Sequence, residues 1–272
     1  MALTTFQKSV CRLLARNRIA SGESYVAGGS ALNELIAAPR ISRDIDLFHD
    51  SEEAVAATWD SDRQLLEKQF EVDVLRERPA FVEARVAGNQ DSVLLQWTRD
   101  SAYRFFPLLE HEELGLVLHP FDLATNKVLA LVGRLEVRDW VDVIECDSSL
   151  QPLGYLAWAA CGKDPGFSPA AILEHAGRSG HYSEAEVAEL SFSSDPPDAM
   201  ELSRRWHTIL QVSEELIAAL PAEEAGKCVL TSAGALFRGG IGEFEPALER
   251  REIRFHPGSI RGAFPRILRN GV

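Results

Sequence analysis

Two aspartates separated by one isoleucine, Asp44 and Asp46, lie shortly after a turn formed by Gly28, Gly29 and Ser30. Side chains alternate across a β-strand, so both carboxylates would project from one face, about 7 Å apart along the strand. Carboxylates placed in this way can bind a divalent cation, or two cations in a phosphoryl-transfer site. The alternative is an acidic, solvated strand face, which is the simpler interpretation of an isolated Asp-x-Asp pair.

The Gly28-Gly29-Ser30 turn adds a second kind of binding group. Glycine has no Cβ and tolerates positive φ, so the backbone can approach another group closely. At a helix N-terminus, free N–H groups favour an anion such as phosphate, and Ser30 can cap the helix or bind that anion. The turn and the aspartates together have the parts needed to hold magnesium with a triphosphate. Arg40 and Ser42, just upstream of the aspartates, can steady the loop or the phosphates. The alternative is that they are ordinary loop residues without such a role.

A second group of charged residues lies in the segment 121–146, which has helical periodicity. Lys127 and Arg134 are seven residues apart and share one helical face, where two cations can hold the β- and γ-phosphates of a departing pyrophosphate. Asp139 and Asp142 lie one turn apart in the following part of the segment. The alternative is an amphipathic helix with a solvated cationic face.

The sequence GGSAL, followed by a helix and by RISRDIDLF, resembles the signature of polymerase-β-type nucleotidyltransferases. It is most similar to the abortive-infection toxins of the AbiEii type, whose Asn-Lys-x-x-Ala-Leu motif places the family's lysine at Lys127. The resemblance implies transfer of a nucleoside monophosphate from an NTP, with Mg²⁺ or Mn²⁺ held by Asp44 and Asp46. It also implies a toxin with an antitoxin partner, and an acceptor hydroxyl on a tRNA 3′ end or on a protein.

One expected residue is missing from this pattern. The fold usually has a third carboxylate on a neighbouring strand, and the position expected to hold it is Gln96. An amide can offer its carbonyl oxygen to a metal but cannot take up a proton at neutral pH. Asp73 and Asp100 are candidate substitutes. The alternative function is therefore a catalytically impaired nucleotide-binding protein that acts through a partner, or a scaffold for protein interaction.

The elements that position these residues follow from hydrophobic periodicity and turn residues. The predicted fold class is α+β: a mixed sheet with helices over residues 1–150, followed by a mostly helical domain over 151–272. Ser30 is predicted to be the N-cap of a helix over 31–38, and Ser51 begins another. Predicted helices cover 5–17, 51–70, 121–146, 153–162, 168–177, 183–192 and 198–220, and predicted strands cover 24–27, 44–48, 70–75, 80–87, 92–98 and 114–119, with a turn at Gly88-Asn89.

The formal net charge of −13 disfavours broad, sequence-independent binding of nucleic acid, which depends on many cationic contacts to phosphate. The stretch 250–270 differs, since it is rich in arginine and contains a single acidic residue. It predicts either a tail folded onto an acidic body or a local nucleic-acid contact. No apolar run reaches the roughly 20 residues needed to span a membrane, so a cytoplasmic protein is expected.

Overall fold

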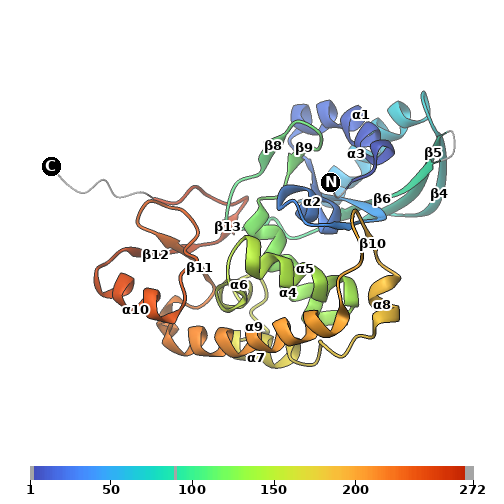
Figure 1. Cartoon of the computed structure of the whole chain (residues 1–272). Coiled ribbons are helices and arrows are strands. Elements are labelled where there is room, and N and C mark those ends of the chain that lie inside the picture. Colours follow the sequence, from blue (N-terminus) through green and yellow to red (C-terminus); the bar gives the residue numbers. More distant parts are fainter. Residues whose placement is uncertain (1–2, 89–90, 267–272) are drawn as a thin grey trace. The chain divides into compact units, whose positions relative to one another are not determined.

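The computed structural model describes residues 3–88 and 91–266, which form two compact units (Figure 1). The first unit contains the residues up to 102 together with 108–119 and 191–194. The second contains 103–107, 120–190 and the residues from 195 onward. The predicted turn at Gly88-Asn89 lies partly outside the described residues.

A seven-stranded mixed sheet is the framework of the first unit, with the strand order β4-β5-β6-β3-β1-β9-β8. Strand β3 lies at its centre, parallel to β6 and antiparallel to β1. The predicted α+β fold with a mixed sheet is therefore confirmed. The strands are β1 (Ser24–Ala27), β3 (Asp44–His49), β4 (Glu71–Arg78), β5 (Phe81–Gly88), β6 (Asp91–Arg99), β8 (Leu109–His111) and β9 (Gly115–Val117).

One face of this sheet is buried beneath helices α1 (Thr5–Ser21) and α3 (Glu52–Leu66), which also contact each other. Trp97 of β6 is fully buried, with its ring centroid 4.7 Å from that of Trp59 in α3. Its indole N–H donates to a carboxylate oxygen of Asp62 at 3.0 Å. Because side chains alternate, the neighbouring residues of β6 and β3 must point to the opposite face.

The helix starts follow the capping rules at one predicted position and depart from them at another. Ser51 caps α3 as predicted, since its hydroxyl accepts a hydrogen bond from the Ala54 N–H at 3.2 Å. The prediction that Ser30 is an N-cap is wrong. Helix α2 (Gly28–Leu35) begins three residues before the predicted start at residue 31, because Gly28 takes a φ of +68° that starts the helix directly after β1. Ser30 instead lies inside the first turn.

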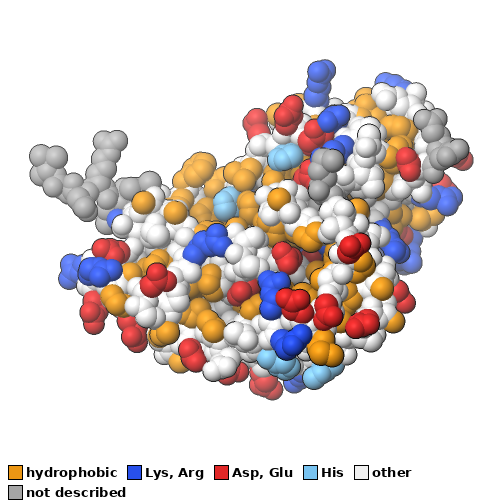
Figure 2. Space-filling view, viewed as in Figure 1, with side chains coloured by type: hydrophobic (Ala, Val, Ile, Leu, Met, Phe, Trp, Pro, Cys, Tyr) orange, Lys and Arg blue, Asp and Glu red, His pale blue; other side chains and the backbone are white. Residues whose placement is uncertain are grey.

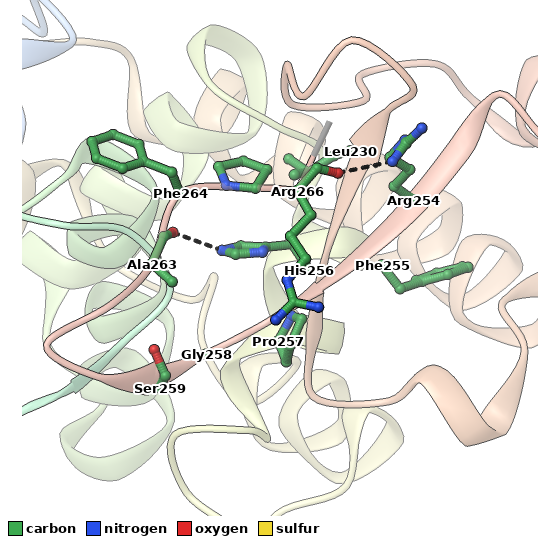
Figure 3. A pocket seen from close by; sticks show the side chains of 11 residues that line it. Leu230, Arg254, Phe255, His256, Pro257, Gly258, Ser259, Ala263, Phe264 and Arg266 are labelled. Carbon is green, nitrogen blue, oxygen red and sulfur yellow. Dashed lines mark hydrogen bonds between the residues drawn. The ribbon is translucent and has the colours of Figure 1, made fainter. Parts of the chain in front are cut away.

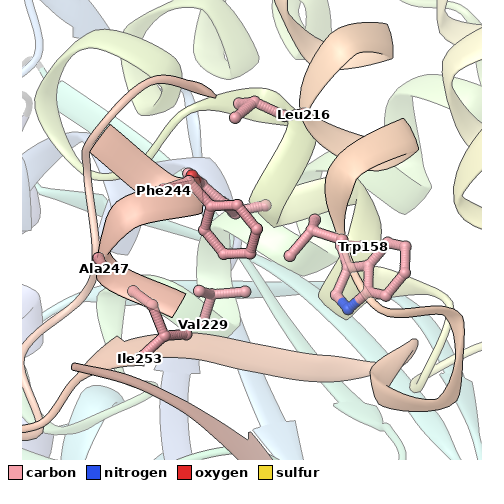
Figure 4. Close-up of a cluster of buried hydrophobic side chains, with 8 residues drawn as sticks. Trp158, Leu216, Val229, Phe244, Ala247 and Ile253 are labelled. Atoms are coloured by element: carbon pink, nitrogen blue, oxygen red, sulfur yellow. The ribbon is translucent and has the colours of Figure 1, made fainter. Parts of the chain in front are cut away.

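The second unit is mostly helical. Its helices are α4 (Pro120–Arg134), α5 (Val137–Ser149), α6 (Leu153–Ala160), α7 (Pro169–Ala176), α8 (Glu184–Ala188), α9 (Ala199–Ala219) and α10 (Ile241–Glu249), with a 3-10 turn η1 (Ala222–Glu224). A cluster of buried apolar side chains joins α6, α9 and α10 to the strand pair β11 (Lys227–Thr231) and β12 (Ile253–Pro257) (Figure 4). Trp158, Phe244 and Val229 contribute from three of these elements.

Several short strands depart from the predictions. The segment 183–192, predicted as one helix, ends its helix α8 at Ala188 and continues into β10 (Ser191–Phe192). This strand belongs to the first unit and pairs with β2 (Arg40–Ile41). The pair β11–β12 lies within the part predicted as mostly helical, and β7 (Tyr103–Arg104) pairs with β13 (Ser259–Ile260). Strands of two to five residues are too short for a clear alternation pattern.

None of the helices in residues 3–88 and 91–266 is both long enough and apolar enough to cross a lipid bilayer. Figure 2 shows acidic and basic side chains interspersed on one face of the molecule, with hydrophobic side chains between them. The excess of acidic residues is therefore not gathered into one patch on that face.

His49, the last residue of β3, makes the stability of the first unit sensitive to acid. It is fully buried, and its Nδ1 lies 3.3 Å from the carbonyl oxygen of Thr98. Burial lowers its pKa from 6.5 to about 4. As the pH falls, His49 is protonated in the unfolded chain before it is protonated in the folded protein. The stability that neutral, buried His49 contributes is therefore complete above pH 6.5 and is lost as the pH falls toward about 4.

We expect wild-type protein to lose about 3 kcal/mol of unfolding free energy through His49 over this pH range. Urea unfolding between about pH 7 and about pH 4.5 measures the loss. A His49→Gln variant should show a flatter pH dependence, whatever its absolute stability. An equal slope in both proteins would contradict the assignment.

Candidate functional site

The two aspartates of β3 lie on the face of the sheet opposite its buried side. Asp44 and Asp46 are partly exposed, whereas Ile45 and Leu47 between and beside them are buried at 1% and 0% exposure. The prediction that the two carboxylates share one face is therefore confirmed. Ser42 donates its hydroxyl to Oδ1 of Asp44 at 2.8 Å, which orients that carboxylate.

The glycine turn lies directly against Asp46. In the antiparallel pair β1–β3, Ala27 is opposite Asp46, and Gly28 follows at the start of α2. A Cβ atom added to Gly28 would overlap Oδ2 of Asp46 and lie 2.7 Å from its Cγ. Only glycine leaves room here for the carboxylate to lie against the backbone. The sequence predicts that another group approaches the backbone of this turn closely, and in the structure that group is the carboxylate of Asp46.

The first turn of α2 is enclosed by the first unit. Gly29 and Ser30 are buried, and the Ser30 hydroxyl donates to the carbonyl oxygen of Ala27 at 3.4 Å. The N–H groups of a helix's first turn have no partners within the helix, so this end is suited to an anion. Helix α2 begins beside Asp46. A metal–phosphate group held there would therefore lie near the partial positive charge of the helix start and the negative charge of the carboxylates.

The loop before β3 holds the remaining predicted residues of this group. Arg40 is buried at 4% exposure in β2, where it lies opposite Phe192 of β10. Ser42 is also buried, and its carbonyl oxygen accepts a hydrogen bond from the Gln7 side chain at 2.8 Å. These contacts fix the loop that leads into Asp44.

Lys127 and Arg134 belong to the second unit, where both pair with aspartates of α5. The Lys127 ammonium lies 3.0 Å from Asp139 and 3.1 Å from Asp142, and its side chain is only 8% exposed. Arg134 donates to both oxygens of Asp139, at 2.6 and 2.9 Å. The four residues form a charge cluster, which we call the α4–α5 cluster, and it braces the two helices.

Asp139 is the centre of the α4–α5 cluster. Burial alone would raise its pKa, but the hydrogen bonds and positive charges of Arg134 and Lys127 outweigh that effect and hold the pKa below its usual value. Asp139 therefore stays ionised in the folded protein. Helix α5 also carries Arg138, whose Nε lies 2.6 Å from the carboxylate of Glu136.

Neither predicted substitute for the third carboxylate lies near Asp46. Asp73 is on β4, where Arg85 donates to it at 2.8 Å. It lies in the same cross-strand row as Asp44 but three strand spacings, about 14 Å, away. Asp100 follows the end of β6, four residues and about 13 Å beyond Gln96.

Glu83 is the residue that sequence reasoning missed. It lies on β5 directly opposite Gln96, which in turn lies directly opposite Asp46. The amide nitrogen of Gln96 donates to a carboxylate oxygen of Glu83 at 2.9 Å. The sequence AFVEARVA carries a signal, because its alternation places Glu83 on the polar face, but only the strand register shows which residue it faces.

The donors on this face fit a hard divalent cation. Carboxylate and amide oxygens are the ligands that Mg²⁺ and Mn²⁺ accept, and the carboxylate of Asp46 lies against Gly28 at the start of α2. Within the described part of the chain, no three His, Cys, Asp or Glu side chains are grouped to hold a metal ion. Substrate phosphates and water would have to complete the coordination, which is usual for Mg²⁺.

A separate cavity of about 720 Å³ lies in the second unit, beside β12 and the segment that follows it (Figure 3). Arg254 donates to the carbonyl oxygen of Arg266 at 2.8 Å. Nε2 of His256 lies 3.1 Å from the carbonyl oxygen of Ala263. Both bonds join residues within the arginine-rich stretch, whose strands β12 and β13 pair with β11 and β7 of the same unit. Residues 267–272 lie outside the described residues.

Comparison with known proteins shows similarity in fold. No family model and no curated protein matches the sequence. A candidate nucleotidyltransferase from Helicobacter pylori is 13% identical with a TM-score of 0.53, covering 79% of this chain and 96% of its own. JHP933 from the same species is 13% identical with a TM-score of 0.51, covering 78% and 91%.

Another similar solved structure is that of MenT4, a nucleotidyltransferase toxin from Mycobacterium tuberculosis H37Rv. It is 16% identical with a TM-score of 0.50, covering 79% of this chain and 83% of its own. The predicted resemblance is thus confirmed for the fold: this chain has the fold of nucleotidyltransferases.

The contact between Gly28 and Asp46 leads to a direct test. A Gly28→Ala variant should weaken binding of a metal–NTP complex at least about tenfold, because the new methyl group displaces the carboxylate. Its positive φ should also cost about 1–2 kcal/mol of stability. Isothermal titration with a non-hydrolysable NTP and Mg²⁺ measures the binding.

Gly22→Ala is the matched control. Gly22 has nearly the same φ, +69°, but a Cβ atom there meets no atom within 4 Å. Gly22→Ala should lose a similar amount of stability through its positive φ, but its affinity for the metal–NTP complex should be unchanged. Equal losses of affinity in the two variants would show that the Asp46 contact is not the cause.

Proposed function

We propose that this protein is a metal-dependent nucleotidyltransferase that moves a nucleoside monophosphate from an NTP to an acceptor hydroxyl, either the 3′ end of an RNA such as tRNA or a hydroxyl of a protein. The observation that supports the proposal most strongly is the contact of Gly28 with Asp46 on a strand face shared with Asp44. It brings an anion-binding helix start and two metal-binding carboxylates together within the fold of nucleotidyltransferases.

The first unit supplies the parts for holding the nucleotide. The backbone of Gly29 and Ser30 would bind phosphate oxygens, and Asp44 and Asp46 would hold the divalent ion. That ion would neutralise charge on the phosphates and align them. Ser42 orients Asp44 by its hydrogen bond at 2.8 Å and so fixes one of the ligands before the nucleotide arrives.

In the transfer step, the acceptor hydroxyl oxygen forms a bond to the α-phosphorus while the bond from that phosphorus to the β-phosphate oxygen breaks. Pyrophosphate leaves with that oxygen, and the hydroxyl proton passes to water. Lys127 and Arg134 are the proposed contacts for the leaving phosphates, a role that rests on the position of Lys127 in the family's motif. Both also brace the second unit through Asp139.

The test is to incubate the protein with Mg²⁺, total tRNA and each NTP, labelled either at the α- or at the γ-phosphate. Nucleotidyl transfer places only the α-label on the acceptor, whereas a kinase would place the γ-label there. Protein extract in place of tRNA identifies a protein hydroxyl as acceptor instead. An Asp44→Asn, Asp46→Asn double variant should give no transfer, and absence of α-label from every acceptor would contradict the proposal.

A second candidate function is a nucleotide-binding protein without transferase activity that acts through a partner. Gln96, which lies where the fold usually has a carboxylate, favours it, because an amide cannot accept the hydroxyl proton. Tight metal–NTP binding without transfer to RNA or protein would support this function over the first.

The similarity to MenT4 also supports a place in a toxin–antitoxin pair. On this proposal the protein arrests growth when it is expressed alone in a bacterial host, and a co-expressed antitoxin protein relieves the arrest. The double aspartate variant separates this effect from general toxicity of overexpression, since it should not arrest growth.

A further inference from the structure

A single row of residues crosses five strands of the sheet in the first unit. From β4 to β1, the residues directly opposite one another are Arg76, Glu83, Gln96, Asp46 and Ala27. Residues opposite each other on neighbouring strands project from the same face. The row therefore connects the glycine turn and Asp46 with a cationic residue at the far side of the sheet.

The polar groups of this row are ordered by their hydrogen-bonding chemistry. Arg76 lies 3.6 Å from the Glu83 carboxylate, whose side chain is only 12% exposed. An ionised carboxylate can only accept hydrogen bonds, so the amide of Gln96 must turn its nitrogen toward Glu83, as the 2.9 Å contact shows. The carbonyl oxygen of Gln96 takes no part in that bond, and Gln96 lies directly opposite Asp46 in the row.

We infer that Gln96 supplies a neutral oxygen ligand to the divalent ion held by Asp44 and Asp46, and that Glu83 is the positioning residue that orients it. This inference rests on the proposed function and concerns the residue where the fold usually has a carboxylate. It explains how the site keeps a third oxygen donor while carrying one negative charge less. The consequence is a site whose hold on the metal depends on the nucleotide phosphates more than a three-carboxylate site would.

The test is binding of Mn²⁺, followed by electron paramagnetic resonance, with a non-hydrolysable NTP and without any acceptor. Gln96→Ala removes the oxygen donor, and Glu83→Leu removes the group that orients it. Each should weaken Mn²⁺ binding about 10–100-fold, the usual effect of losing a ligand's orienting partner. Glu83→Gln keeps a hydrogen-bond acceptor, so it should lose clearly less than Glu83→Leu.

Asp73→Asn is the matched control. Like the Glu83 variants, it removes one carboxylate charge on this sheet and leaves an arginine, Arg85, without its acidic partner. It should bind Mn²⁺ within about twofold of wild type, because Asp73 is about 14 Å from the site. Thermal unfolding of each variant identifies any loss that is due to misfolding, and circular dichroism confirms the fold before binding is measured.

The outcomes separate this inference from the proposed function. If wild type binds Mn²⁺–NTP, Asp46→Asn does not, and the Gln96 and Glu83 variants bind like wild type, the inference is overturned while the proposed function stands. Equal losses in Glu83→Leu and Asp73→Asn would also overturn it, since they would indicate a general charge effect. If wild type binds no Mn²⁺–NTP, both fail.

Discussion

Asp46→Asn is expected to lower the rate of nucleotide transfer by about 10²–10³-fold, the usual cost of removing one preorganised charged contact from an active site. Asp46 is the carboxylate that lies against Gly28 and opposite Gln96, so it is common to all parts of the proposed site. Asparagine keeps the size and one oxygen of the side chain, and the fold should therefore persist. The initial rate of α-label transfer, at saturating NTP and Mg²⁺, measures the effect.

Two further variants define what a specific loss looks like. Asp44→Asn should reduce the rate to a similar degree, because the second carboxylate shares the same face. Asp60→Asn removes an exposed carboxylate from α3, on the covered side of the sheet, and should leave the rate unchanged. Transfer by Asp46→Asn at more than about a tenth of the wild-type rate would argue against a metal-binding role for this residue.

Asp139→Ala is expected to lower the free energy of unfolding by about 1.5–3 kcal/mol, because buried Lys127 loses one of its two carboxylate partners and Arg134 loses both hydrogen bonds to Asp139. Asp139 is fully buried and contacts Lys127 at 3.0 Å and Arg134 at 2.6 Å. Its lowered pKa adds a pH dependence: the stabilisation is complete above the usual carboxyl pKa and is lost as the pH falls below it. Urea unfolding near neutral pH measures the loss of stability.

Glu136→Ala tests whether burial is the cause of this large effect. Glu136 pairs with Arg134 at 3.7 Å and with Arg138 at 2.6 Å, but its side chain is 42% exposed. An exposed pair contributes about 0–1 kcal/mol, so this variant should be nearly as stable as wild type. Similar losses in Asp139→Ala and Glu136→Ala would mean that burial is not the cause of the effect at Asp139.

The sequence was sufficient to predict most of the regular elements of the first unit and the shared face of Asp44 and Asp46. These predictions depend on local patterns: the alternation around Ile45 and Leu47, the serine cap at Ser51, and the periodicity of residues 5–17. Local patterns are reliable where burial of one face decides the structure. The error at Ser30 arose because Gly28 can itself begin the helix, which no capping preference expresses.

The remaining features of the site depend on which strands become neighbours. Glu83 and Gln96 are thirteen residues apart, and only the register of β5 against β6 brings them into contact. The partners of Lys127 are set in the same way, by the packing of α4 against α5. A helical face with a lysine does not show whether the ammonium meets water, phosphate or an aspartate of its own chain.

The pairing of β10 with β2 has a consequence for how the chain can be divided. Residues 191–194 return to the first unit after the helices that precede them, and Ser191 lies opposite Ile41 while Phe192 lies opposite Arg40. A fragment that stops at residue 150 would strip the loop before Asp44 of this strand and uncover the backbone of Arg40. The two units are therefore interleaved along the gene, and neither can be exchanged between relatives by recombination at a single point.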